Sequence, residues 1–106
     1  MKIFFQVLFG AVLIGAVMVA APADVEKGKE TFEQCSVCHN VDTDEKKMGP
    51  SLMGLFKKEK MTSNGKKPTE ANVKAVINAG GNGMPAYADM LADDEKTNLL
   101  AYLKTL

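Results

Sequence analysis

Both cysteines and the only histidine of the 106-residue chain lie within five consecutive positions. The run is Cys35-Ser36-Val37-Cys38-His39, which is the pattern C-x-x-C-H. Three kinds of chemistry use such residues. Two thiols can form thioethers to haem while the adjacent histidine binds the iron. Alternatively, C-x-x-C can carry out thiol–disulfide exchange, or cysteine and histidine can bind zinc.

The rest of the sequence matches two of these chemistries poorly. Exchange motifs lie near βαβ units, and this chain has no evident strand-like alternation of polar and apolar residues. Zinc prefers four ligands, so a carboxylate would have to join the two cysteines and the histidine. The motif therefore predicts one covalently attached haem c, with Cys35 and Cys38 as thioethers and His39 as the proximal iron ligand.

The sixth ligand of such an iron separates an electron carrier from a haem that binds small molecules. With no second histidine, methionine is the natural candidate, and Met84 is favoured. It follows the glycine-rich residues 80–83, which can approach a flat group closely, and it precedes Pro85, which favours an extended backbone. Met53 lies in an apolar stretch and is better interpreted as a core residue. The remaining candidates beyond the N-terminal segment are Met48, Met61 and Met90.

Helical periodicity and capping residues predict the elements that must position these side chains. Asp24 can cap a helix over residues 24–34, and Thr69 can cap one over residues 70–79 that ends at the glycines. Acidic residues 93–95 open a last helix that runs to residue 104. One or two helical turns are expected in residues 51–56, with polar loops at 40–50 and 57–68. The predicted fold class is all-α, with three or four short helices and long loops wrapped around one haem, which supplies the core that so small a domain lacks.

Residues 1–23 differ sharply from the rest of the chain. Eighteen of them are hydrophobic, Lys2 is the only charged residue, and Ala21-Pro22-Ala23 has the small-x-small pattern of a cleavage site. We expect a signal peptide cleaved after Ala23 that exports a domain of residues 24–106 to the periplasm. The apolar run is also long enough to remain as an uncleaved membrane anchor, so the alternative is a tethered domain that faces the periplasm.

Charge excludes one class of partner. Residues 24–106 carry 12 lysines, no arginine and 13 acidic residues, so they lack the positive surplus that nucleic-acid binding requires. Five lysines nevertheless gather in residues 57–67 and could orient an acidic redox partner protein, or merely keep a loop solvated. Asp42, Asp44 and Glu45 form an acidic cluster with the same two interpretations.

Several motifs, in their order along the chain, resemble class I monohaem cytochromes c of the small exported bacterial type. These are Gly28 with Phe32, the C-x-x-C-H run, the segment Gly49-Pro50-Ser51-Leu52, the segment Gly83-Met84-Pro85-Ala86-Tyr87, and the apolar residues 99–103. The resemblance covers nearly all of residues 24–106 and is more specific than C-x-x-C-H alone. It implies an electron carrier rather than an enzyme, with His39 and Met84 as the two axial ligands.

The resemblance also implies details that the residues alone do not give. The Pro50 carbonyl is expected to accept a hydrogen bond from His39, and Gly28 and Phe32 are expected to cross the last helix at Leu99 and Tyr102. Two features depart from the family pattern. Ala92 stands where a capping serine or threonine is common, so Asp93 is a candidate cap, and the family pattern assigns no role to the lysine-rich residues 57–67.

Overall fold

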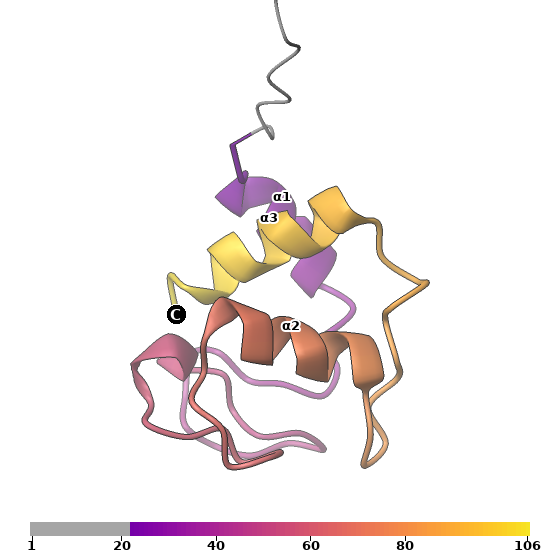
Figure 1. Ribbon diagram of the computed structural model, residues 1–106. Coiled ribbons are helices and arrows are strands. Elements are labelled where there is room, and N and C mark those ends of the chain that lie inside the picture. Colours follow the sequence, from indigo (N-terminus) through magenta and orange to yellow (C-terminus); the bar gives the residue numbers. More distant parts are fainter. Residues whose placement is uncertain (1–21) are drawn as a thin grey trace, which may run out of the picture.

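The computed structural model describes residues 22–106, which form three α-helices and one short 3-10 helix (Figure 1). The elements are α1 (Val25–Phe32), η1 (Leu55–Lys57), α2 (Glu70–Ala79) and α3 (Asp93–Leu103). Within this part of the chain the only bridge between extended segments is the isolated pair Gly81 and Met84. The all-α prediction is therefore confirmed.

The predicted signal peptide or anchor falls almost wholly on residues 1–21, which lie outside the described residues. Among residues 22–106, no helix is long and apolar enough to cross a membrane.

Helices α1 and α3 cross each other (Figure 1). A glycine and an aromatic pair lie at the crossing, as the family resemblance implied. Gly28 is buried, and a Cβ atom there would lie 2.6 Å from the Asn98 carbonyl carbon and 2.9 Å from the Tyr102 Cβ. The Phe32 and Tyr102 rings pack with centroids 5.3 Å apart and planes tilted by 51°. A side chain at position 28 would separate the helices, so glycine is required by their close approach.

Capping side chains set the helix starts largely as predicted. The Asp24 and Thr69 side chains accept hydrogen bonds from the backbone N–H groups of Lys27 and Asn72, each at 3.1 Å. The expectation that Asp93 caps α3 is wrong. Ala92 occupies the N-cap position, and the Glu95 carboxylate accepts from the Ala92 N–H at 3.0 Å, which is the glutamate half of a capping box.

The core contradicts the interpretation of Met53. Met53 is 41% exposed, whereas Met61 is 7% exposed and belongs to the core. Gly54 has φ 66°, and this left-handed turn leaves Leu52 and Leu55 facing the interior and Met53 outside. Met61 is buried in a loop that closes on itself, where its N–H donates to the Lys66 carbonyl at 2.8 Å. The buried hydrophobic residues are Phe32, Leu55, Met61, Val73, Ile77, Tyr87, Leu91, Leu99, Leu100 and Leu103.

Candidate haem-binding site

The two cysteines lie on consecutive turns that continue from the end of α1. The Cys35 N–H donates to the Phe32 carbonyl at 2.7 Å, and the N–H groups of Cys38 and His39 both donate to the Cys35 carbonyl at 3.1 Å. Both thiols are free and half-buried. The backbone therefore holds two unpaired thiols and a histidine on one compact turn, which is the arrangement that attachment of haem by two thioethers needs.

Burial raises the pKa of the Cys35 thiol above its ordinary value, and the neighbouring Cys38 raises it further. Thiol–disulfide exchange depends on a thiolate and is promoted by the opposite shift. The environment of Cys35 therefore argues against the exchange interpretation. Within residues 22–106, no three His, Cys, Asp or Glu side chains are grouped closely enough to hold a metal ion.

The His39 ring is held from one side by the segment that follows the first polar loop. Its Nδ1 atom lies 2.7 Å from the Pro50 carbonyl oxygen. A carbonyl oxygen can only accept, so Nδ1 carries the proton, and Nε2 keeps its lone pair for a metal. Gly49 lies against the ring, where a Cβ atom would be 2.5 Å from His39 Cε1.

The carbonyl that receives this hydrogen bond is itself fixed by neighbouring contacts. The Gly49 N–H donates to the Cys38 carbonyl and the Leu52 N–H to the Asn40 carbonyl, both at 2.8 Å. Ser51 is buried, and its hydroxyl contacts the carbonyls of Asn40 and Thr43. Ser51 belongs to the segment that carries the family resemblance, but its spacing in the sequence gave no sign of this bridging role.

Met84 lies on a tight turn between α2 and α3. The N–H of Gly81 donates to the Met84 carbonyl at 2.9 Å, and the Met84 N–H donates back to the Gly81 carbonyl at 3.0 Å. Gly80, Gly81 and Gly83 have φ of 63°, 120° and 89°, which only glycine adopts readily. Further along the chain, the Tyr87 N–H donates to the Ile77 carbonyl at 3.0 Å, which attaches this segment to α2.

His39 and Met84 line the same cavity, although they come from loops far apart in the sequence. Its other lining side chains are apolar or carry sulfur: Phe32, Cys35, Leu52, Ile77, Leu99 and Leu103. Met48, Met53 and Met90 are exposed, and Met61 packs in the core without lining the cavity. Of the five candidate methionines, the structure brings only Met84 to the cavity that His39 lines.

These residues suit haem in their chemistry. The cavity presents an imidazole, a thioether and a thiol within an apolar wall, which are the donors and the environment that a c-type haem uses. The Asn78 side-chain oxygen is buried without a hydrogen-bond donor among residues 22–106, but Asn78 is not one of the residues that line this cavity. The cavity measures about 40 Å³.

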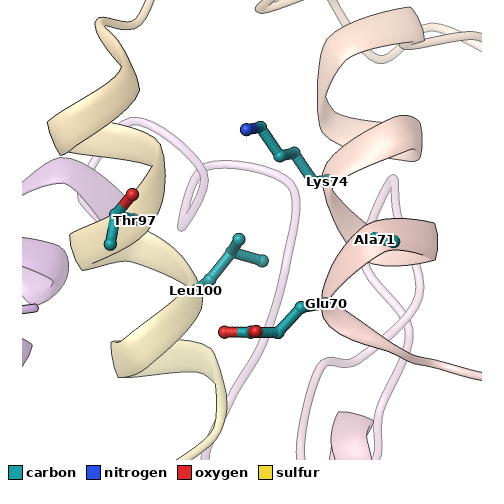
Figure 2. Close-up of a pocket in the computed structure, with 5 residues that line it drawn as sticks. All are labelled: Glu70, Ala71, Lys74, Thr97 and Leu100. Atoms are coloured by element: carbon teal, nitrogen blue, oxygen red, sulfur yellow. The ribbon is translucent and has the colours of Figure 1, made fainter. Parts of the chain in front are cut away.

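A larger and more open hollow of about 240 Å³ lies between α2 and α3 (Figure 2). Glu70, Ala71 and Lys74 line it from α2, and Thr97 and Leu100 from α3. The Glu70 carboxylate is engaged by Lys104 at 2.6 Å. No thiol, imidazole or thioether lines this hollow, so it offers haem neither attachment nor axial ligation.

Comparison with known proteins supports the haem interpretation. Residues 25–106 match the family model for cytochrome c. The chain is 39% identical over 74 residues to cytochrome c2 of Blastochloris viridis, an alignment that covers 68% of this chain and 58% of that relative. It is 31% identical over 98 residues to cytochrome c2 of Rhodoplanes tepidamans, covering 76% and 99% of the two chains. Cytochrome c6 of Diacronema lutheri is 33% identical over 81 residues, covering 76% and 93%.

A small all-α domain with a C-x-x-C-H turn against an apolar cavity defines an electron-transfer haem protein. The chain belongs to the cytochrome c family, as a class I monohaem member. The cofactor of the chain is one covalently bound haem c. Members of the cytochrome c family are electron carriers rather than enzymes.

Proposed function

We propose that this protein is an exported electron shuttle whose haem is attached through Cys35 and Cys38 and whose iron is bound by His39 and Met84. The observation that carries the axial assignment is the shared cavity of His39 and Met84. When bound, the haem iron supplies a one-electron couple between Fe(III) and Fe(II). With both axial positions held by protein side chains, little has to rearrange when the electron is transferred.

Residues of the chain set the reduction potential of the haem iron. The hydrogen bond from His39 Nδ1 to the Pro50 carbonyl orients the ring and makes Nε2 a better donor. The Met84 thioether is a soft ligand that favours the ferrous state. Leu52, Ile77 and Leu99 keep water from the cavity, which disfavours the more highly charged ferric state.

The distal assignment is tested by replacing Met84 with alanine in the holoprotein. The ferric spectrum should lose the charge-transfer band at the red end that a thioether ligand produces, and the reduction potential should fall. Met53→Ala, at an exposed methionine, is the matched control and should keep both. A Met84 variant with the wild-type band and potential would refute this assignment. Ready binding of cyanide by the wild type at neutral pH would instead favour a haem enzyme or sensor.

We further propose that an acidic redox partner docks against the lysine-rich residues 57–67. All five lysines there are exposed, and residues 24–106 as a whole are close to neutral, so the positive charge is a local feature. Electron-transfer rates with such a partner should fall as ionic strength rises. A charge-reversing Lys66→Glu/Lys67→Glu variant should lose most of this salt dependence, whereas Lys27→Glu/Lys29→Glu, on α1, should keep it. Equal loss in both variants would exclude this docking surface.

We also propose that the shuttle works in the periplasm, with residues 1–23 removed as a signal peptide. The support is the sequence pattern: an uncharged apolar run after Lys2, followed by Ala21-Pro22-Ala23. N-terminal sequencing of the mature protein should begin at Asp24. A sequence that begins at Met1 in the membrane fraction would replace the shuttle by an anchored carrier.

A further inference from the structure

Lys96 is a charged residue buried beside the segment that carries Met84. It lies on the second turn of α3 and is 5% exposed, a burial that few lysines in proteins reach. Its Nζ atom donates to the Ala88 carbonyl at 2.9 Å. Ala88 follows Met84 by four positions, so this hydrogen bond ties α3 directly to the loop of the distal ligand. None of the motifs that identify the family includes Lys96.

Among residues 22–106, the ammonium group of Lys96 has few polar partners. An ammonium has three donors, and Ala88 is the single hydrogen-bond partner that the structure gives it among residues 22–106. Within the same residues, no carboxylate lies at ion-pair distance from Lys96. The Ala88 carbonyl is therefore the polar group of this part of the chain that fixes the position of the Lys96 side chain.

The loop that Lys96 holds has few other attachments. Residues 80–92 contain no helix, and their glycines at 80, 81 and 83 permit many backbone conformations. The loop is fixed by the reciprocal Gly81–Met84 hydrogen bonds, by the Tyr87 N–H donating to the Ile77 carbonyl, and by burial of Tyr87 and Leu91. A turn closed on the Tyr87 carbonyl and the bond from the Ala92 N–H to the Glu95 carboxylate hold its last residues. The hydrogen bond from Lys96 is the one that connects a side chain of α3 to residues 84–91.

We propose that Lys96 is a positioning residue that keeps Met84 on the haem iron by clamping the Ala88 carbonyl to α3. This proposal rests on the proposed function, in which Met84 is the distal ligand. Without the clamp, the loop opens more often, and each opening exposes the sixth coordination position. An external ligand that binds only the open form then binds more tightly in proportion to the population of that form.

The test uses imidazole as the external ligand and the ferric holoprotein. Lys96→Met keeps the volume of the side chain and removes the ammonium. Loss of a hydrogen bond from a charged donor should raise the apparent affinity for imidazole about tenfold or more. Lys96→Arg retains a charged donor and should remain within about twofold of wild type on the same scale. Lys104→Met removes the exposed lysine at the C-cap of α3 and should also leave the affinity unchanged.

Each outcome bears on the proposal. Wild-type imidazole affinity in Lys96→Met would overturn it, even if that variant unfolds more easily, because burial alone would then explain Lys96. An equal rise in Lys104→Met or in Lys96→Arg would overturn it as well. Should Lys96→Met not accumulate as holoprotein, Lys96→Gln, which lacks the charge, is compared in the same way. Failure of the Met84 assignment is separate, because it would appear in the spectrum of the wild type and of Met84→Ala.

Discussion

The His39 imidazole is enclosed between the Pro50 carbonyl, which accepts its Nδ1 proton at 2.7 Å, and the backbone of Gly49. Consecutive residues thus fix both the direction of the ring and the space it occupies. The Gly49 N–H is anchored to the Cys38 carbonyl at 2.8 Å, which joins this segment back to the C-x-x-C-H turn. The proximal side of the site is therefore a closed loop of short backbone contacts.

Replacing Gly49 by alanine should disturb this arrangement directly. The new Cβ atom would lie 2.5 Å from His39 Cε1 and 2.8 Å from Nδ1, so the ring must shift from its place beside the Pro50 carbonyl. We expect the holoprotein to lose about 1–3 kcal/mol of unfolding free energy, as overpacked sites do, with a change in reduction potential. Denaturant titration and potentiometry measure the two effects.

Gly65→Ala is the control for the Gly49 variant. Gly65 has φ 68°, so alanine is strained there by about 1–2 kcal/mol, but no atom lies within 4 Å of the added Cβ. This variant should lose stability and keep the wild-type potential. An unchanged potential in Gly49→Ala as well would show that the His39 ring tolerates the displacement.

Gly28→Ala should destabilise the crossing of α1 and α3. Alanine favours a helix by about 1 kcal/mol over glycine. At this position that gain is outweighed, because the Cβ would meet the Asn98 carbonyl and the Tyr102 Cβ, and backbone cannot rotate aside. A net loss of about 1–3 kcal/mol is expected from denaturant titration. Lys29→Ala, at the exposed next position, should remain within about 0.5 kcal/mol of wild type. A Gly28 variant as stable as wild type would mean that the helices can separate without loss.

The sequence predicted the elements with clear local signals and failed where tertiary packing decides. Thr69 caps the start of α2 and Gly80, with a positive φ, ends it, and the predicted range of residues 70–79 is the observed one. Met53 and Met61 could not be ranked for burial, because the turn at Gly54 and the closure of the loop at Lys66 decide which of them faces inward. A lysine in a polar helix start normally remains in water, so the burial of Lys96 had no sequence signal.

Some features of the candidate site could likewise be predicted from the sequence, and others could not. The attachment turn and the favoured distal methionine follow from residue type and spacing, because thioether attachment requires a fixed separation and a methionine after glycines can approach a flat group. The support behind them depends on contacts between segments. Ser51 reaches the carbonyls of Asn40 and Thr43 only because the polar loop folds back on itself, and no local pattern encodes that contact.

Tyr87 should make stability decrease at alkaline pH. Burial raises the pKa of its hydroxyl above the ordinary value of about 10, with Cys35 and Cys38 adding to the shift. In the holoprotein both cysteines would be thioethers without charge, so burial alone remains. A pKa raised by folding means that the contribution of Tyr87 is complete below about pH 10 and is lost as pH rises through the folded-state pKa. Denaturant titrations from about pH 8 to about pH 11 bracket the ordinary tyrosine pKa. Over this range the free energy of unfolding should fall less in Tyr87→Phe than in wild type. Identical pH profiles would show that the phenol ionises as readily in the folded protein as in the unfolded chain.

Removing the attachment cysteines should remove the fold itself. The cavity that His39 and Met84 share lies at the centre of a domain of about 80 residues with long loops, a size at which an apolar core alone gives little stability. We expect Cys35→Ala or Cys38→Ala to weaken retention of haem, and the double variant to accumulate as an apoprotein with little helical circular dichroism. Mass spectrometry of the wild type after acid–acetone extraction should give the mass of the chain plus haem, because thioether bonds survive extraction. Ser36→Ala, between the two cysteines, is the matched control and should retain haem, since its hydroxyl donates only to the Glu33 carbonyl. A double variant that stays helical without haem would show that the surrounding core, and not the cofactor, stabilises this domain.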